Sequence, residues 1–551
     1  MAFERPFNMS VLRELFTNHE LLYREDHRPQ PSDPKHVRSV AILGGGTAGW
    51  LTALALRHQL RWLNVTVIET PSIPIVGVGE ASVPSLVPFL HRYLGLDILE
   101  LDREVRPTWK QGIRFEWGMP GKYVFQAPFD WEVNGVGMLG SMGETKNVSA
   151  FTLQSHLMER GTTPILKSKK GLSSFLPVLA FAYHLENDKF VGYLRRKATE
   201  RGVTHLETRI ADAAVTNVDG DDEPHIASLT TEDGDTLDFD FYVDCSGFGS
   251  FLLEKKLGAS YESYASSLFT DRAFAFNASH GGKLAPYTTA RTMKSGWCWT
   301  IPMHESNHHG YAYSSAHLSD EEAVAEVKAV WPIIEHERFV RFRSGRHDRL
   351  WIGNVYAVGN SYAFVEPLES TGIMMIQRAI TALVRAFPIG PGSGTIRRFL
   401  NASVGNDWDR LRWFLAAHFK FNKRLDTPFW EACRADVDVS ALQTALDLYE
   451  ACGPLSLLPR AMRKSLEDQA GFLFYGLHGL DTILLGQKVP HREIKREPKA
   501  VWKKRQAIAN DFARRGLPYP KAIEVMKQHP EWLQQVIDEP GGWANKMAAF
   551  L

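Results

Sequence analysis

The stretch VRSVAILGGGTAGW, residues 37–50, decides the fold. Its apolar first half predicts a buried strand, and a helix is predicted directly after it, over 47–60. A second strand is predicted at Asn64–Glu69. A strand, a helix and a strand in this order imply a parallel sheet, because parallel neighbours need a crossover connection.

The glycines between the first strand and the helix have the spacing of a dinucleotide-binding turn. Gly44 permits the tight turn, Gly46 lets the backbone approach a pyrophosphate, and Gly49 allows close packing of helix on strand. The residues between them, Thr47 and Ala48, open the helix, whose N-terminus faces the phosphates. We therefore predict a dinucleotide site here.

Two further segments complete the predicted cofactor site. Glu69 stands 20 residues after Gly49, at the end of the second strand, where a carboxylate can bind a ribose. The late segment VYAVGNSYAF resembles the strand–Gly-Asp–helix segment of glutathione-reductase-type flavoproteins, with Gly359 and Asn360 in the place of Gly-Asp. FAD is therefore the expected cofactor. No second GxGxxG occurs, so reduced flavin is expected from a separate flavin reductase.

Composition limits the class of protein. The 551 residues are 44% hydrophobic and 23% charged, and 63 basic side chains balance 63 acidic ones. A broadly basic nucleic-acid binder is therefore not expected. The four cysteines lie far apart without metal-ligand spacing, which predicts no metal and a reducing, cytoplasmic setting. The sequence contains no apolar run of 18 or more residues, so no membrane span is predicted.

Three regions are expected along the chain. Residues 1–36 read as an N-terminal extension and linker, and 37–400 as an FAD-binding Rossmann-like module with an inserted mixed-sheet region. Residues 401–551 read as a mainly helical region that covers the substrate and ends in a charged tail. The fold class is α/β (α+β). The basic tail from Pro490 is interpreted as a solvated helix face rather than as a site for an acidic partner.

Four motifs make the chain resemble the flavin-dependent halogenases of the tryptophan-halogenase family. They are GGGTAGW at 44–50, GVGEASVPSL at 77–86, GWCWTIP at 296–302 and FVEPLESTG at 364–372. The resemblance spans roughly 37–487. WxWxIP and FVEPLESTG together are specific, since neither is a general flavoprotein motif.

The resemblance implies a reaction in two places. In this family reduced FAD (FADH2) and oxygen convert chloride or bromide into hypohalous acid, which travels through a channel to a lysine beside the substrate. There an aromatic ring is halogenated, most often the indole of tryptophan, free or embedded in a peptide. A role in antibiotic biosynthesis is also typical of the family.

The family's lysine corresponds to Lys110 in WKQGIRFEW. Alternation predicts one strand over 109–117, with Lys110, Arg114 and Glu116 on one face. From periodicity alone this face would be solvated, and the matching motif reverses that interpretation. A functional Lys110 has to face an interior cavity, where desolvation favours the neutral amine.

The resemblance assigns further roles to the segment LESTG. Glu369 corresponds to the family's assisting glutamate, and Ser370 links the flavin region to the lysine. Halide is expected at the backbone N–H groups of Thr371 and Gly372, at a helix N-terminus. The structural alternative, compatible with these roles, is that Ser370 or Thr371 caps the helix.

Trp297 and Trp299 alternate on one predicted strand, so both side chains face the same way. The resemblance implies a wall that keeps the organic substrate away from the flavin. Simple core packing is the alternative, and it is compatible with the wall.

The substrate pocket is where the resemblance weakens. Free-tryptophan halogenases carry a His-x-Phe element after the lysine, and here the corresponding region reads KYVFQAPFDWE. Gln126, Phe129 and the later Trp430 are the candidate substrate contacts, with core packing as the alternative for Trp430. The N-terminal extension and the altered pocket allow a larger substrate, such as tryptophan inside a peptide.

Other functions remain open at this point. One is a flavin-dependent aromatic monooxygenase that hydroxylates its substrate, and another is a halogenase of a phenol, a pyrrole or a carrier-bound substrate. A third is a flavoprotein-like binding module without turnover. A homodimer is compatible with the sequence as well.

Overall fold

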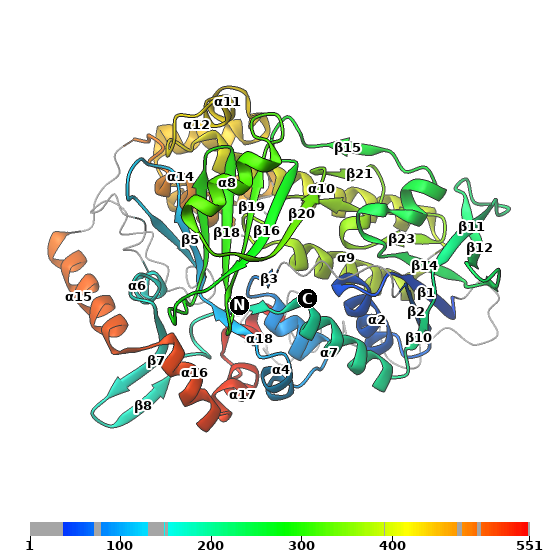
Figure 1. Cartoon of the computed structure of the whole chain (residues 1–551), viewed down its shortest axis with the longest axis horizontal. Coiled ribbons are helices and arrows are strands. Elements are labelled where there is room, and N and C mark those ends of the chain that lie inside the picture. Colours follow the sequence, from blue (N-terminus) through cyan, green and yellow to red (C-terminus); the bar gives the residue numbers. More distant parts are fainter. Residues whose placement is uncertain are drawn as a thin grey trace, which may run out of the picture.

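The computed structural model describes residues 37–70, 79–129, 148, 152–390, 392–470, 476–492 and 498–548. The predicted N-terminal extension, 1–36, lies outside the described residues, as do the first two residues of the GVGEASVPSL motif. The predicted α/β class is confirmed. A parallel sheet with helices lies on the right in Figure 1, and a second, larger sheet lies at its centre.

The parallel sheet contains the predicted strand–helix–strand unit. The Val-Ala-Ile centre of its strand β1 is buried, and β1 pairs in parallel with β2 and β14. All neighbours in the sheet are parallel except the last pair, β23 and β22. The strands, in sheet order, are β10 (Thr204–Glu207), β2 (Asn64–Glu69), β1 (Ser39–Leu43), β14 (Phe241–Asp244), β23 (Val355–Ala357) and β22 (Trp351–Ile352).

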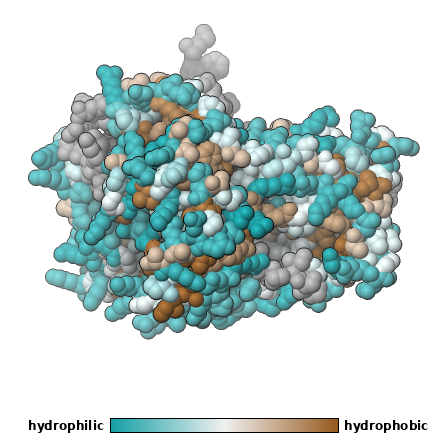
Figure 2. Space-filling view, turned by 45° about the horizontal axis from the view of Figure 1, so that its top comes forward, coloured by the Kyte–Doolittle hydropathy of each residue, from teal (hydrophilic) through white to brown (hydrophobic). Residues whose placement is uncertain are grey.

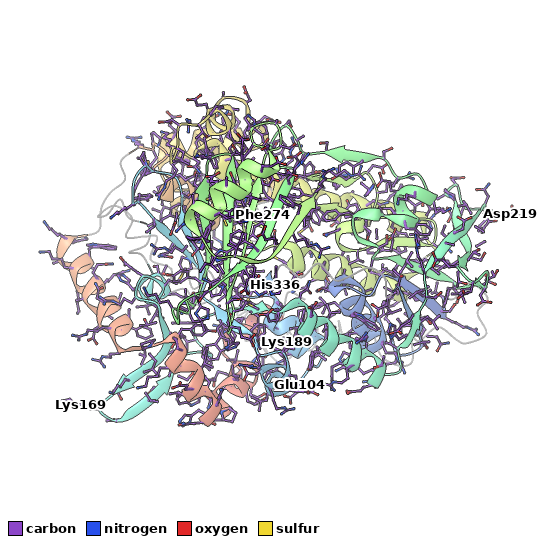
Figure 3. All side chains as sticks on the ribbon, viewed as in Figure 1. Glu104, Lys169, Lys189, Asp219, Phe274 and His336 are labelled. Carbon is purple, nitrogen blue, oxygen red and sulfur yellow. The ribbon has the colours of Figure 1, made fainter. Side chains whose placement is uncertain are left out.

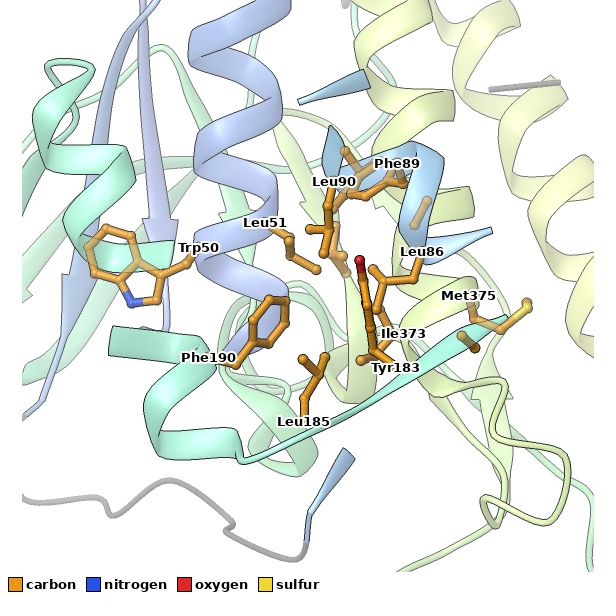
Figure 4. Close-up of a cluster of buried hydrophobic side chains, with 14 of the residues drawn as sticks. Trp50, Leu51, Leu86, Phe89, Leu90, Tyr183, Leu185, Phe190, Ile373 and Met375 are labelled. Atoms are coloured by element: carbon orange, nitrogen blue, oxygen red, sulfur yellow. The ribbon is translucent and has the colours of Figure 1, made fainter. Parts of the chain in front are cut away.

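Three helices form the core around the predicted cofactor site. Helix α2 (Thr47–Gln59) packs against α7 (Asn187–Glu200) and α9 (Gly372–Ala386). Figure 4 shows apolar side chains from these helices meeting Tyr183 and Leu185. By length and composition α9 with its following turn could cross a membrane, but 61% of this window is buried, as in the core helix of a folded domain.

The second sheet has seven strands and confirms the strands predicted at GWCWTIP and GYAYSS, which pair as β18 and β19. It is antiparallel except between β17 and β5. One of its faces is covered by α8 (Asp320–Val330). The strands, in sheet order, are β20 (Glu335–Arg341), β16 (Arg272–Ala278), β19 (Asn307–Tyr313), β18 (Gly296–Pro302), β17 (Thr288–Met293), β5 (Gly112–Glu116) and β6 (Phe125–Pro128).

The single strand predicted over 109–117 is wrong. The strand is interrupted at Gln111. Before it, β4 (Thr108–Lys110) pairs with β9 (Ala182–Leu185), and after it, β5 belongs to the seven-stranded sheet. The Gln111 side chain donates to the carbonyl of Thr162 across this break. Alternation of side chains cannot reveal a change of sheet, because the pattern continues through it. Lys110 therefore does not share a solvated face with Arg114.

The C-terminal part is mainly helical and is tied to the strand that carries Lys110. Tyr519, at the start of α16, is fully buried, and its hydroxyl accepts a hydrogen bond from the backbone N–H of Trp109. The basic side chains of α15 are exposed, while Ala509 and Ala513 on its other face are buried. The helices are α10 (Gly394–Lys420), α11 (Pro428–Asp436), α12 (Gln443–Cys452), α13 (Arg460–Ala470), α14 (Gly476–Gly486), α15 (Lys499–Arg515), α16 (Tyr519–Gln528), α17 (Glu531–Asp538) and α18 (Trp543–Ala548).

Smaller elements complete the described chain. Lys169, at the tip of the β7–β8 hairpin, and Asp219, between β11 and β12, mark opposite ends of the molecule (Figure 3). The face displayed in Figure 2 is mostly hydrophilic, with hydrophobic residues in small groups. The remaining elements are β3 (Glu80–Ala81), α3 (Leu86–Pro88), α4 (Ile98–Glu104), α6 (Leu153–Arg160), β7 (Thr162–Ser168), β8 (Gly171–Ser174), β11 (Ile210–Thr216), β12 (His225–Thr231), β13 (Thr236–Leu237), β15 (Tyr261–Ser263), β21 (Gly345–His347), β24 (Ala363–Phe364) and β25 (Gly516–Pro518).

Candidate active site

Lys110 is buried at the end of β4, with none of its surface exposed. Its ammonium nitrogen, Nζ, donates a hydrogen bond of 2.6 Å to Oγ of Ser370. The ring of Phe129 lies beside it, with its centroid 5.5 Å from Nζ. The fold thus brings Ser370 to Lys110 and Phe129, although Ser370 follows Lys110 by 260 residues.

Burial makes the Lys110 amine unusually easy to deprotonate. Desolvation lowers its pKa to about 7, and the negative charge of Glu369 opposes this by favouring the ammonium form. The imidazole of His184, also fully buried, has a pKa well below the usual value because of its own burial and the charge of Lys110. Near neutral pH a neutral amine at Lys110 is therefore readily accessible, beside a neutral histidine.

Ser370 stands in a strained turn that leads into α9. Its φ of 58° is left-handed, which costs a non-glycine residue roughly 1–2 kcal/mol, and its N–H donates to the carbonyl of Pro367. Thr371 holds the predicted N-cap position of α9, but its side chain makes no capping hydrogen bond. The hydroxyl of Ser370 does not cap the helix and instead accepts from Lys110. A Cβ added to Gly372 would meet nothing within 4 Å, so the N-terminus of α9 faces open space.

Glu369 is 3% exposed and bonds to a histidine that the sequence analysis missed. Oε1 of Glu369 lies 2.7 Å from Nε2 of His418, on α10, and Nδ1 of His418 lies 2.9 Å from the carbonyl of Phe414. The sequence signal for His418 was its position as a lone histidine in the apolar stretch FLAAHF. That position indicates that the side chain is buried, but it does not indicate which residue it contacts.

The two tryptophans of β18 stand side by side, with ring centroids 5.7 Å apart, and both are buried. Nε1 of Trp297 donates a 2.5 Å hydrogen bond to Oε2 of Glu366, a second residue that the sequence analysis missed. Burial raises the pKa of Glu366 to about 7. A Cβ at Gly310 would lie 1.8 Å from Cζ2 of Trp299, so this glycine makes room for the indole.

The glycine turn has the geometry of a phosphate cradle. A Cβ on Gly44 would lie 2.2 Å from the carbonyl oxygen of Cys245, and one on Gly49 would lie 1.9 Å from the carbonyl oxygen of Gly44. Gly46 differs, because a Cβ there would meet nothing within 4 Å. The crowded glycines shape the turn and the open one presents backbone to a ligand, so the residues present fit a dinucleotide.

Around this cradle Thr47, Ala48 and Gly359 take part in local packing. Thr47 donates to Oδ1 of Asn187 at 3.2 Å. Gly359, with a φ of 74°, lies so close to Ala48 that their side-chain carbons would be 3.1 Å apart if Gly359 had one. Asn360 follows it and is exposed.

Glu69 lies against the glycine turn, since a Cβ on Gly45 would overlap its carboxylate. The carboxylate bonds to Nε2 of His205 at 2.7 Å and lies 3.7 Å from Arg195. Glu69, His205 and Glu207 together offer three potential metal ligands within 4.8 Å of one another. They are partly exposed and lie next to the predicted ribose position.

The three candidate substrate residues are placed differently. Phe129 lies next to Lys110, whereas Gln126 is buried on β6 opposite Arg114. Trp430 has the contacts of a core residue, because it is fully buried, stacks on Phe419 and donates to the carbonyl of Met293.

The chain thus has an α/β fold with the glycine turn of a dinucleotide site, and its buried Lys110 contacts Ser370 just before α9. The chain belongs to the tryptophan halogenase family, whose profile matches residues 39–501. The protein is therefore an enzyme of this class, and its family implies a flavin cofactor and an aromatic substrate.

Two curated relatives and two solved structures illustrate the relationship. Tryptophan 7-halogenase KtzQ of Kutzneria sp. (strain 744) is 33% identical over 451 residues, which are 77% of this chain and 84% of that protein. Tryptophan 7-halogenase RebH of Lentzea aerocolonigenes is 34% identical over 444 residues, 75% of this chain and 82% of that protein.

The structure of MibH, described as a lathipeptide tryptophan 5-halogenase, matches with a TM-score of 0.89 and 47% identity over 95% of this chain and 99% of that one. The tryptophan 6-halogenase SttH of Streptomyces toxytricini matches with a TM-score of 0.77 and 27% identity over 88% of this chain and 100% of that one.

Proposed function

We propose that this enzyme uses reduced FAD, oxygen and chloride or bromide to halogenate the indole ring of a tryptophan held in a peptide. The observation that carries the proposal is the buried hydrogen bond between Lys110 and Ser370, next to Glu369 and at the entrance to α9. Lys110 thus contacts Ser370, on the predicted cofactor side of the fold, and also lies beside the aromatic ring of Phe129. A separate flavin reductase supplies the reduced cofactor.

On the cofactor side the chain binds FAD and halide and keeps the organic substrate apart from them. Gly46 and the N-terminus of α2 hold the pyrophosphate, and the N–H groups of Thr371 and Gly372 hold the halide. When bound, reduced FAD supplies the chemistry that makes hypohalous acid from halide and oxygen. Trp297 and Trp299 keep the organic substrate away from it, so a small oxidant has to pass between the two sites.

On the substrate side Lys110 holds the halogenating agent and Glu369 accepts the proton that the ring loses. The neutral amine of Lys110 holds hypohalous acid, and its low pKa makes this form accessible near neutral pH. Transfer of the electrophilic halogen from hypohalous acid to an indole carbon breaks the oxygen–halogen bond, releases hydroxide and leaves that carbon with one proton too many. The carboxylate of Glu369 accepts this proton, which restores the aromatic ring.

The peptide part of the proposal rests on the similarity to MibH and on the absence of the His-x-Phe element, and a competition experiment tests it. Free L-tryptophan and a tryptophan-containing peptide are offered together with FAD, a flavin reductase, NADH, oxygen and halide. We expect kcat/KM for the peptide to exceed that for the amino acid at least about tenfold, the effect of roughly 1.4 kcal/mol of added binding. Equal turnover of both would contradict the peptide part, while either halogenated product would support the halogenase.

The buried amine of Lys110 should also make the stability of the fold depend on pH. The pKa of Lys110 is about 7 in the folded chain, below its value in the unfolded chain, so between these values the unfolded chain binds the extra proton. Stability then rises with pH through this window, by at most roughly 1.4 kcal/mol per pH unit. The cost of the buried charge is greatest below pH 7.

Lys110→Met, which keeps the volume and removes the charge, should therefore be more stable than the wild type, with a gain that is largest at and below pH 7 and declines toward pH 10. The measurement is the free energy of unfolding in urea at several pH values for both proteins. A difference that does not change with pH would show that Lys110 keeps an ordinary pKa in the folded protein.

A further inference from the structure

An open groove lies between strand β7 and helix α15, which stand next to each other at the left of Figure 1. Its volume is about 390 Å³, and its apolar lining includes Leu166 from the strand and Ile508 and Phe512 from the helix. The ring of Phe512 is held by an edge-on contact with Phe175, with ring centroids 5.3 Å apart, whereas Ile508 is 58% exposed. The groove therefore presents a fixed apolar surface that a side chain of a partner can bury.

The helix that forms one wall of the groove is strongly basic. Residues 499–515 contain six basic side chains and one acidic side chain, whereas the whole chain carries 63 of each. Lys504 and Arg515 line the groove itself, and Lys504 is exposed. The single acid, Asp511, also lines the groove and pairs with Arg514 and Arg515 of the same helix. This concentration of positive charge favours an acidic partner, because complementary charges guide association.

The groove is built on elements that also hold the active site. The carbonyl of Thr162, the first residue of β7, accepts a hydrogen bond from the side chain of Gln111, which directly follows Lys110. The hydroxyl of Thr162 donates to the carbonyl of Ala513 on α15 at 3.1 Å. Leu166 follows Thr162 by four residues along β7, which is about 13 Å at roughly 3.3 Å per residue. An extended peptide covers the same distance with about four residues.

We propose that this groove is a docking site for the peptide that carries the target tryptophan, and that it takes an apolar side chain of this peptide flanked by acidic ones. The proposal rests on the peptide part of the proposed function. The apolar lining provides for a side chain, the charge of Lys504 selects acidic neighbours, and free tryptophan is too short to occupy both sites. Nucleic acid also binds basic surfaces, but its phosphates do not need an apolar lining.

Binding of synthetic peptides tests the proposal without flavin, halide or turnover. Each probe carries an uncharged dye, one tryptophan, and the tripeptide Glu-Leu-Glu placed about six residues before or after the tryptophan. Matched probes carry Lys-Leu-Lys instead. By fluorescence anisotropy at low salt we expect the wild type to bind one of the acidic probes at least about tenfold more tightly than its matched probe, with a preference that shrinks as salt is added. Equal affinities would overturn the proposal.

Reversal of the charge at Lys504 locates this preference. Lys504→Glu should weaken binding of the acidic probe about fivefold and strengthen binding of the Lys-Leu-Lys probe. Lys503→Glu is the matched control, because Lys503 is exposed on the same helix and does not line the groove. Equal losses in the two variants would assign the preference to the overall charge of α15 and would overturn the proposal.

The apolar part of the groove has its own test. Ile508→Ser should weaken binding of the Glu-Leu-Glu probe at least about threefold, because it removes apolar area that the leucine buries. A probe with Glu-Ser-Glu should bind the wild type and this variant alike. Ile333→Ser removes another exposed isoleucine, which does not line the groove, as the control for a general effect on the fold. A loss of the same size with Glu-Ser-Glu, or with Ile333→Ser, would contradict the assignment of the groove.

Kinetics and competition complete the test. In the halogenation assay Lys504→Glu should raise KM for the acidic peptide about fivefold without lowering kcat, because the groove lies apart from the reacting atoms. An equal loss of kcat/KM for free L-tryptophan would place the effect in the active site, and displacement of the probe by oligouridine at a lower concentration than by the unlabelled acidic peptide would identify a nucleic-acid site. Either result would overturn the proposal. A failure of the proposed function is distinguishable, since it would appear as absence of halogenated product while the binding preference persists.

Discussion

Lys110→Ala should lower the rate of halogenation by on the order of 10³-fold or more, while oxidation of reduced flavin continues at the wild-type rate. The amine is the group that holds the oxidant at the substrate in this account, and alanine offers neither a donor nor a nucleophile. The measurement pairs mass spectrometry of the organic product with stopped-flow absorbance of the flavin. Hypohalous acid should now escape and halogenate an acceptor added to the solution.

Two controls accompany this variant. Lys110→Met keeps the volume of the side chain and should be as inactive as alanine, which separates chemistry from a packing defect. Lys169→Ala removes an exposed lysine at the tip of the β7–β8 hairpin and should be fully active. Product formed by Lys110→Ala at the wild-type rate would remove Lys110 from the mechanism.

Glu369→Gln should lower the halogenation rate by on the order of 10²-fold without changing the affinity for FAD. Glutamine keeps the size of the side chain and a carbonyl oxygen that can face His418, but it cannot accept the proton of the indole ring. The rate in a single turnover reports the chemical step, and titration of flavin fluorescence reports binding.

A different result for Glu369→Gln would change its assignment. If the variant lost FAD while enzyme saturated with FAD kept its rate, Glu369 would be mainly a structural residue at the start of α9. Glu262→Gln, at an exposed position that pairs with Arg346, serves as the control for loss of a carboxylate elsewhere.

The cofactor half of the fold could be predicted because its signals are local. The first strand, the glycine turn and α2 follow each other within 23 residues, from 37 to 59, and hydrophobic periodicity reports such an arrangement directly. The same periodicity failed at Gln111, where the chain passes from one sheet to another. The pairing of Lys110 with Ala182 that buries the lysine joins residues too far apart for any local pattern.

The partners of the predicted site residues could not be predicted for the same reason. Glu369 meets His418, and Trp297 meets Glu366, only because helices and strands from distant parts of the chain pack together. The left-handed conformation of Ser370 was equally hidden, since serine has no marked preference for it. Motif resemblance pointed to Lys110, Glu369 and Ser370, and the structure adds how they are held.

The measurement that tests the central claim most directly is high-resolution mass spectrometry of a tryptophan-containing peptide after reaction with the enzyme, FAD, a flavin reductase, NADH, oxygen and either chloride or bromide. We predict a product whose indole fragment carries the isotope pattern of the halide supplied. A product with one added oxygen atom, formed equally without halide, would contradict the account and identify a hydroxylase instead.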